Sequence, residues 1–222
     1  MAYPGLENLA QMDQVFIKQQ FEVFEILSGC EMNNKYALKD SRGQQFMMAR
    51  EDTDCCTRQC CGPARAFEMG LFDNQEQEIL HLSRPYKCSS CCCPCCLQTL
   101  EVSCPSTGAT LGSIHQEWGF CTPMSGKFSV KNISDDTLLT IQGPCCAVGC
   151  GSDVVFKVLT DDGSSEVGEI VKVWRGWCAE ALTDDENFKV TFPVDLEVQI
   201  KALLLGAAFL IDFLYFETQR NN

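Results

Sequence analysis

The sequence has little of what enzyme active sites are usually built from. Its 222 residues include only two histidines, His81 and His115, each within a stretch that predicts a β-strand. It contains no nucleophile-elbow, phosphate-loop, dinucleotide-binding or zinc-protease pattern. We therefore expect a protein that is not a catalyst of covalent chemistry.

Positive charge is also scarce. The chain has 17 Lys and Arg against 30 Asp and Glu, which gives a formal net charge of -13 at pH 7. Nucleic acid is not expected as a partner, because phosphate contacts need clustered basic side chains. A purely electrostatic hold on anionic lipid is excluded for the same reason. Attachment to a membrane would need another anchor, or a cation that bridges two negative surfaces.

No secretory leader is recognisable at the start of the sequence. Residues Met1 to Leu27 carry acidic and amide side chains throughout and no continuous apolar stretch. Ala2 excludes N-myristoylation. We therefore expect the 17 cysteines to be reduced, so their clustering needs an explanation other than disulfides.

Short segments of alternating polar and apolar residues, separated by turn signals, predict an all-β domain. About a dozen strands favour closure into a barrel, which removes exposed edges. The expected strands are Phe21–Leu27, Lys35–Asp40, Gln44–Arg50, Phe67–Asp73, Glu76–Ser83, Thr99–Ser103, Thr110–His115, Lys127–Asn132, Leu138–Gln142, Val154–Thr160, Glu169–Trp174 and Phe188–Phe192.

The beginning of the chain follows a different pattern. Leu6–Lys18 predicts a short helix, because Leu9, Met12 and Phe16 would share one helical face. No repeat or linker divides the rest. We expect an N-terminal segment over residues 1–20, one domain over residues 21–217 that includes an apolar helix at 196–216, and a tail over residues 218–222.

Residues 196–217, LEVQIKALLLGAAFLIDFLYFE, form the one long apolar run. The part between Lys201 and Glu217, Ala202–Phe216, would reach about 22 Å as a helix, whereas a bilayer core is about 30 Å thick. An aspartate near the bilayer centre would cost about 2.5–3.5 kcal/mol. A helix that is apolar all round can instead fill the core of a domain. A membrane span and a central core helix both stay open for a segment defined by Ala202, Leu205, Phe209, Asp212 and Phe216.

Cysteine forms two clusters, at positions 55–61 and 88–96. In the second, Pro94 disfavours strand pairing, and the exposed loop that this predicts would suit acylation. Each buried CH₂ of a palmitoyl chain contributes about 0.8 kcal/mol, and more than one chain gives stable anchoring. The C-x₂-C spacings would also suit zinc or an iron–sulfur cluster. A third interpretation treats the thiols as small apolar side chains.

Carboxylates gather just before the apolar run. Asp184, Glu186 and Asp195 could supply oxygens to Ca²⁺, which takes several oxygen ligands at about 2.3–2.6 Å. The segment is not an EF-hand, because it lacks the glycine at the sixth position and lies on a predicted strand. Spacing alone favours a solvated acidic turn over a calcium site.

Four stretches together resemble the phospholipid scramblase family. They are FEVFEILSG at residues 21–29, EDTDCCTRQCCGPAR at 51–65, CSSCCCPCC at 88–96 and DDENFKVTFPVDLEVQIKALLLGAAFLIDFLYFE at 184–217. Their order along the chain matches the family, and matching segments extend from Pro4 to Glu217. The resemblance therefore covers almost the whole sequence.

This resemblance implies a mainly β, Tubby-like fold: a closed twelve-stranded barrel around a central apolar C-terminal helix. It implies calcium-activated, ATP-independent, bidirectional translocation of phospholipids between membrane leaflets. The expected location is the plasma membrane, with the domain facing the cytoplasm. The alternative function is a membrane-tethered regulatory module that binds lipids or proteins without translocating lipid.

The resemblance also assigns sites. The palmitoylated run of the family, which would make the chain a lipoprotein, corresponds to Cys91, Cys92, Cys93, Cys95 and Cys96. Its calcium segment corresponds to Asp184, Glu186, Phe188, Val190, Phe192 and Asp195, with side-chain ligands expected from Asp184, Glu186 and Asp195. Glu186 stands where the family usually has aspartate.

Membrane phospholipids are the expected partner. One short helix makes no obvious path for a lipid, so translocation is expected to need several copies of the chain. Family members usually begin with a proline-rich region that this sequence lacks, so SH3 and WW partners are not expected. GEIVKVWRG at residues 168–176 aligns with a basic nuclear-import stretch, but Glu169 and Val171 dilute its charge, and nuclear import is not expected either.

Overall fold

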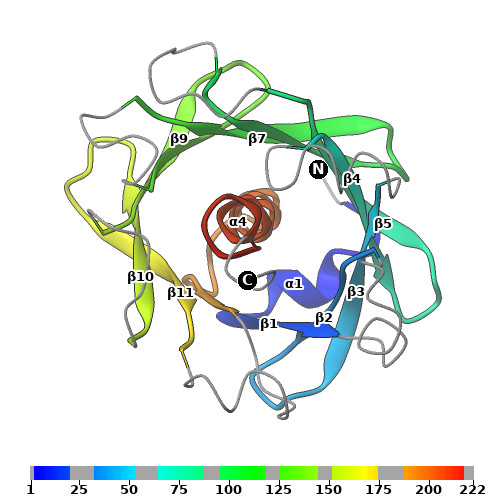
Figure 1. The fold of residues 1–222 in the computed structure, drawn as a ribbon. Helices are drawn as coiled ribbons and strands as arrows, with labels where there is room; N and C mark the ends of the chain where they lie inside the picture. Colours follow the sequence, from blue (N-terminus) through cyan, green and yellow to red (C-terminus); the bar gives the residue numbers. More distant parts are fainter. Residues whose placement is uncertain are drawn as a thin grey trace.

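The structure is a computed structural model that describes residues 3–20, 33–53, 65–87, 96–118, 126–144, 152–174 and 188–217. These residues form a closed β-barrel with one long helix along its inside (Figure 1). The expected fold is confirmed.

Twelve antiparallel strands make the wall of the barrel. Each strand pairs with its neighbours in the chain, and β12 pairs with β1 to close the circle. The closing register joins Gln14 to Thr191 and Ile17 to Phe188. The strands are β1 Gln14–Gln20, β2 Lys35–Lys39, β3 Gln45–Asp52, β4 Phe67–Asp73, β5 Glu78–Arg84, β6 Thr99–Cys104, β7 Ala109–Gln116, β8 Lys127–Lys131, β9 Thr137–Gln142, β10 Val154–Thr160, β11 Glu166–Lys172 and β12 Phe188–Thr191.

Side chains along each strand alternate between the inside and the outside of the barrel. In β1, Val15 and Ile17 are buried, whereas the residues between them are partly exposed. In β10, Val154, Phe156 and Val158 are buried in the same way. This period of two is the signal that predicted strands from the sequence, so the predicted strands between Lys35 and Phe192 are confirmed to within three residues at each boundary.

The predicted helix at Leu6–Lys18 is wrong over most of its length. The helix α1 covers only Glu7–Ala10, and Gln14–Gln20 is the strand that closes the barrel. Leu9 and Phe16 fit a helical spacing, but Val15 and Ile17 also fit a strand. Pairing with β2 on one side and β12 on the other selects the strand. The barrel therefore includes residues before position 20, while the predicted strand Phe21–Leu27 lies outside the described residues.

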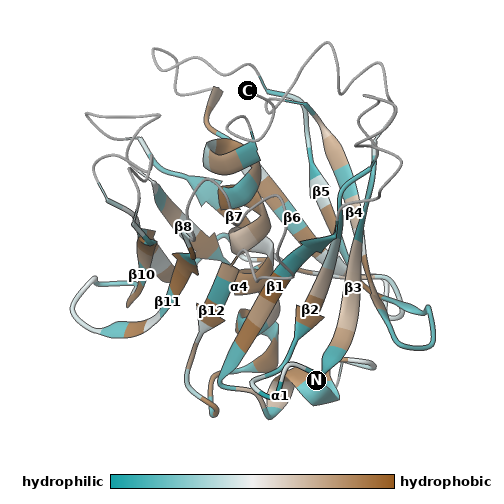
Figure 2. Ribbon diagram, turned by 60° about the horizontal axis from the view of Figure 1, so that its bottom comes forward, coloured by the Kyte–Doolittle hydropathy of each residue, from teal (hydrophilic) through white to brown (hydrophobic). Residues whose placement is uncertain are grey.

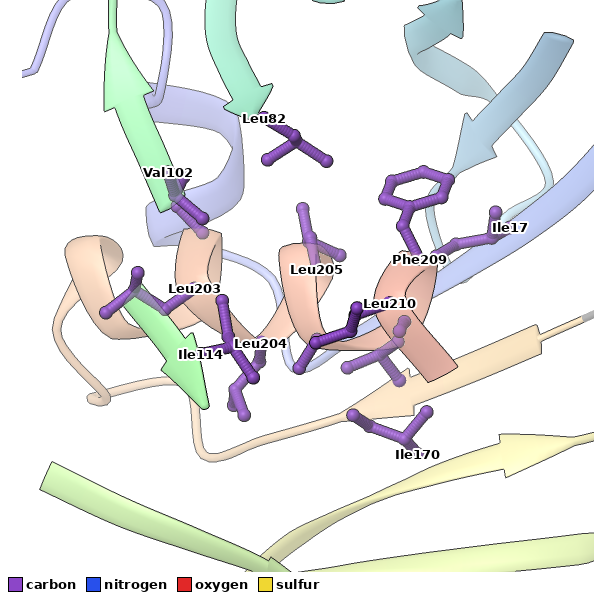
Figure 3. Packing of buried hydrophobic residues seen from close by; sticks show 14 of the residues in the cluster. Ile17, Leu82, Val102, Ile114, Ile170, Leu203, Leu204, Leu205, Phe209 and Leu210 are labelled. Carbon is purple, nitrogen blue, oxygen red and sulfur yellow. The ribbon is translucent and has the colours of Figure 1, made fainter. Parts of the chain in front are cut away.

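The long helix, α4 (Val198–Ile211), runs inside the barrel and continues as a π-helical turn, η3 (Asp212–Phe216). Every residue from Lys201 to Phe213 is buried. Figure 3 shows Leu203, Leu204, Leu205, Phe209 and Leu210 of the helix packed among side chains from several strands, including Ile17, Leu82, Val102, Ile114 and Ile170. The helix is apolar all round because the barrel surrounds it.

A glycine marks the closest approach of the helix to the wall. A Cβ atom added to Gly206 would lie 2.9 Å from Cγ2 of Val102 and 3.3 Å from Cδ1 of Ile114. Real Cβ atoms do not approach neighbours so closely. Glycine at this position therefore lets the helix lie against β6 and β7.

By length and composition, Val198–Phe216 could also cross a membrane, but 72% of its apolar window is buried inside the structure. Of the two interpretations left open by the sequence, the structure supports the core helix. Ala202, Leu205, Phe209, Asp212 and Phe216 all lie in the interior, and each is at most 5% exposed.

Leu205→Ala should lower the free energy of unfolding by about 2–5 kcal/mol, because a fully buried leucine leaves a cavity. Val155→Ala is the control, because Val155 is 38% exposed on β10, and it should change stability by less than about 0.5 kcal/mol. Urea unfolding in detergent-free buffer measures both. Equal, small effects would show that α4 is not part of the folded core.

Candidate functional site at the two ends of the barrel

The barrel has two chemically different ends. One end holds α1, the connection from α1 to β1, the start of α4 and the short connections that follow β2, β4, β6, β8, β10 and β12, and we call it the turn end. The opposite end, where η3 finishes, we call the exit end. In Figure 2 the N-terminus marks the turn end, at the bottom, and the C-terminus marks the exit end, at the top.

Acidic residues dominate the connections of the turn end. Arg42 is their only basic residue. On the adjoining strands, Arg50 and Lys131 pair with Glu76 and Asp135 at 3.1 and 3.0 Å. The acidic residues of these connections are Asp13, Asp40, Glu76, Asp135, Asp136, Asp161, Asp162, Asp195 and Glu197.

Several of these carboxylates are held by the backbone of their own turn. Asp40 accepts hydrogen bonds from the N–H groups of Arg42 and Gln44 at 2.9 and 2.8 Å. Hydrogen bonds from Thr160 and Ser164 lower the pKa of Asp162 to about 2. Such bonds favour the ionised form of Asp162.

Lys201 is a buried residue that joins several segments of the turn end. Its side chain is fully buried, and its ammonium donates hydrogen bonds of 2.9, 2.8 and 2.8 Å to the carbonyl oxygens of Ala10, Met12 and Val194. Burial lowers the pKa of Lys201, although the negative charges nearby oppose that shift. The residue that bounds the apolar run in the sequence therefore ties the start of α4 to both α1 and the turn after β12.

Arg65 organises the charged groups at the exit end. Its guanidinium makes two hydrogen bonds to the carboxylate of Glu217, at 2.9 and 2.6 Å, and one of 2.9 Å to Glu51. Asn34 donates to Glu51 and Glu217 at 2.7 and 3.1 Å. The ring of Phe213 lies under the guanidinium, with 4.9 Å from Cζ to the ring centroid. The end of the helix is therefore bound to the wall by a buried bidentate ion pair.

Two further buried groups complete this charged cluster. Tyr36 on β2 donates a hydrogen bond of 2.8 Å to Asp212 of η3. Arg84 at the end of β5 donates to Oε1 of Gln98 at 3.1 and 2.8 Å. Polar contacts at the exit end thus join the barrel wall to the helix, as in Tyr36–Asp212, and join parts of the wall to each other, as in Arg84–Gln98. The middle of the barrel is apolar.

Burial shifts the pKa values in this cluster. It raises the pKa of Glu217, and the hydrogen bonds from Arg65 oppose the shift without cancelling it. It lowers the pKa of Arg84 to about 10, against the attraction of Glu217 and with the repulsion of Arg65. The pKa of Arg65 is raised, because its two carboxylates outweigh the cost of burial. The pKa of each group in the cluster therefore depends on the charges of the groups beside it.

The structure describes part of the predicted calcium segment. Phe188, Val190 and Phe192 are buried apolar residues at the inner face of β12 and beyond its end. Asp195 is exposed in the turn before α4, at the turn end. Asp184 and Glu186 lie outside the described residues. About 10 Å of extended chain, from Phe188 to Thr191, separates the two ends of the segment.

A shared ion would need all three carboxylates within a few ångströms of one another, because calcium–oxygen distances are about 2.3–2.6 Å. The described residues do not bring Asp195 to the start of β12. In the described part of the chain, no three His, Cys, Asp or Glu side chains form a group that could hold a metal ion.

Of the cysteines predicted to be acylated, the structure describes one. Cys96 is only 6% exposed. Acylation requires an accessible thiol, so Cys96 is not a substrate in this conformation. The others, Cys91, Cys92, Cys93 and Cys95, lie outside the described residues, in the connection from β5 to β6. Zinc or an iron–sulfur cluster at these cysteines stays a prediction.

Comparison with known proteins identifies the family. The Scramblase family model matches residues 2–218. The chain belongs to the scramblase family. It is 49% identical to human phospholipid scramblase 1 over 215 residues and 48% identical to bovine phospholipid scramblase 2 over 217 residues. It is 39% identical to the human phospholipid scramblase family member 5 over 214 residues.

The matched region covers nearly all of this chain but a smaller share of its scramblase relatives. The alignments cover 97% of this chain but 66% of human phospholipid scramblase 1 and 65% of the mouse protein of the same name. They cover 73% of the bovine protein and 78% of family member 5. The chain thus spans slightly less than two thirds of the first of these relatives.

Sequence reasoning about this scramblase-family chain missed the residues that hold the helix in place. Lys201, Asp212 and Glu217 were visible as charged residues in or beside the apolar run. Each indicated that a partner was needed, because buried charges are costly when unpaired. The partners, Tyr36 and Arg65, lie more than a hundred residues earlier in the chain, and no local pattern pointed to them.

Arg65→Met should lower the free energy of unfolding by about 3–5 kcal/mol, because it leaves Glu51 and Glu217 buried without their cation. Lys157→Met is the control. It breaks an exposed pair with Glu166, whose side chains are 60% and 47% exposed, and should cost about 1 kcal/mol or less. Chemical denaturation at neutral pH measures both, and equal effects would contradict the role assigned to Arg65.

Proposed function

We propose that this chain moves phospholipids in both directions between membrane leaflets, without ATP and in response to calcium. The observation that carries the proposal is the family match over residues 2–218, together with 49% identity to human phospholipid scramblase 1. The match includes the barrel, the internal helix and the cysteine-rich connection. The proposed location is the cytoplasmic face of the plasma membrane.

Acylation is the proposed attachment. A net charge of -13 gives no electrostatic hold on anionic lipid, so the chain needs an apolar anchor. Palmitoyl chains on Cys91, Cys92, Cys93 and Cys95 would supply it, since two or more chains give stable anchoring. The burial of α4 inside the barrel supports the proposal, because this helix presents no apolar surface to the bilayer.

The structure constrains the route that a lipid could take. Because α4 and η3 occupy the inside of the barrel, a headgroup would not pass through it. Translocation would instead use the outer surface of the domain, through local thinning of the bilayer or a polar path between copies of the chain. A homo-oligomer is therefore part of the proposal.

Calcium is proposed to act through Asp184 and Glu186. These carboxylates precede β12 in the chain, whereas Asp195 follows it, in the turn before α4. Neutralising them would reduce repulsion between the chain and anionic headgroups. Because Asp195 follows the other end of β12, we propose that the ion binds without it.

Asp184→Asn with Glu186→Gln should reduce calcium-dependent lipid scrambling at least about tenfold, because both changes remove a charged ligand while keeping size. The measurement is bidirectional exchange of a fluorescent phospholipid in vesicles that contain the purified chain. Asp195→Asn is the matched control and should leave the calcium response unchanged. Loss of the response in Asp195→Asn alone would show instead that Asp195 is a ligand.

Replacing Cys91, Cys92, Cys93 and Cys95 together by serine should move the chain from the membrane fraction of cells to the soluble fraction. Cys96→Ser is the control and should leave its distribution unchanged, because the Cys96 thiol is buried. Fractionation combined with detection of thioester-linked palmitate measures the effect. Unchanged membrane attachment of the fourfold variant would remove acylation from the proposal.

A second candidate function is a membrane-tethered module that binds lipids or proteins without moving lipid. The enclosed helix favours it, because this helix does not offer the bilayer a continuous apolar surface. The vesicle assay separates the two. If calcium produces no lipid exchange at any density of the chain while the chain still binds the vesicles, the binding-module hypothesis stands and the translocator hypothesis fails.

A further inference from the structure

We propose that a hollow on the outer wall of the barrel binds the ethanolamine headgroup of a phospholipid, with the phosphate at one end of the hollow and the ammonium at the other. The inference rests on the lipid-translocating function proposed above. It adds a headgroup site and a preference among headgroups.

The hollow lies over β8 and β9, between the end of β7 and the end of β10. In Figure 1 these strands form the stretch of wall between the labels β7 and β10. Its volume is about 460 Å³, which is within the range of about 300–1,000 Å³ of small-molecule sites. The described residues that line it are Glu117, Lys127, Ser129, Asp136, Thr137, Thr140 and Asp161.

A cation without a partner lies at one end of the hollow. Lys127 begins β8, and its ammonium makes no hydrogen bond or ion pair with the residues that the structure describes. Glu117 lies beside it, but the carboxylate of Glu117 accepts a hydrogen bond from the hydroxyl of Ser129 and forms no ion pair with Lys127. The ammonium is therefore available to an anionic group such as a phosphate.

Carboxylates lie at the other end of the hollow. Asp136 directly precedes β9 and Asp161 directly follows β10, so both belong to the turn end. The side chain of Asp161 has no partner among the described residues. The carboxylate of Asp136 accepts one hydrogen bond of 3.1 Å, from the amide of Asn132. Because a carboxylate can accept several hydrogen bonds, both aspartates can receive N–H groups of a primary ammonium.

Two hydroxyl groups line the space between these ends. Thr140 pairs with Ser129 in the middle of β8, and Thr137 pairs with Lys131 beside the turn. Neither threonine hydroxyl has a partner in the described part of the chain. The two threonines are roughly 7–10 Å apart along the wall. A phosphate near Thr140 and an ammonium near Thr137 suit a headgroup in which two carbon atoms separate the charged ends.

The lining favours ethanolamine over choline and serine. The quaternary ammonium of choline has no N–H group to donate to Asp136 and Asp161. None of the described lining residues is aromatic, so no aromatic cage replaces those hydrogen bonds. Serine adds a carboxylate, which the same two aspartates would repel. Ethanolamine has neither disadvantage.

The position of the hollow fits the route proposed for the lipid. Because α4 fills the interior, a headgroup has to travel outside the barrel. Polar groups are costly to move through hydrocarbon without hydrogen-bond partners. The hollow offers such partners on the outer surface, between the two ends of the barrel.

Binding of water-soluble headgroups tests the site. Glycerophosphoethanolamine, glycerophosphocholine and glycerophosphoserine are titrated into the purified chain by isothermal titration calorimetry. We expect glycerophosphoethanolamine to bind at least about fivefold more tightly than the other two. Lys127→Gln, and separately Asp136→Asn with Asp161→Asn, should each weaken its binding at least about fivefold, because each change removes hydrogen bonds between charged groups.

Lys157→Gln and Glu166→Gln are the matched controls. These two exposed residues pair with each other outside the hollow, at 3.0 Å, and neither change should alter the affinity. Lys127, Asp136 and Asp161 are exposed as well. All variants should therefore unfold at the same temperature as the unsubstituted chain, which thermal unfolding checks.

Absence of binding at millimolar concentration, equal affinity for the three headgroups, or an affinity that neither substitution changes would overturn the proposal. Exchange of a fluorescent phospholipid in vesicles separates this result from translocation. If the expected binding pattern holds but no lipid is exchanged, the headgroup site stands and the proposed function fails. If lipid is exchanged while the binding pattern fails, the headgroup site alone is wrong.

Discussion

The mutual burial of a closed barrel and an apolar helix is the constraint on which the rest of this structure depends. A twelve-stranded barrel is too wide for its own side chains to fill, and a helix that is apolar on every side cannot face water. The helix fills the inside of the barrel, and the barrel shields the helix from water. Gly206 shows how close the fit is, because one additional carbon atom there would meet Val102 at 2.9 Å.

Charged residues fix the helix at both ends of the apolar interior. At the turn end, the buried ammonium of Lys201 bonds to backbone carbonyls of α1 and of the turn after β12. At the exit end, Arg65 donates hydrogen bonds to Glu217, and Tyr36 donates one to Asp212. Apolar packing alone would allow the helix to slide along or rotate about its axis. These polar contacts specify one position, since any displacement would leave a buried charge unpaired.

The same arrangement shapes the functional argument. Because the helix occupies the interior, neither a lipid path through the barrel nor an anchor formed by the enclosed helix fits the structure. We propose covalent lipid as the anchor instead. Among the described residues, acidic connections lie at the turn end, and the two points where the cysteine-rich connection joins the barrel lie at the exit end.

The sequence by itself determined the strands between Lys35 and Phe192, the existence of the apolar helix, and the family. These depend on local periodicity and on long matching motifs. The tertiary structure alone decided that Gln14–Gln20 is a strand, because its helical and extended patterns were both acceptable until β12 and β2 paired with it. It also decided that the helix fills the barrel, that Arg65 reaches Glu217, and that Asp195 lies at the turn end. Contacts between residues so far apart in the chain leave no local pattern from which they could be predicted.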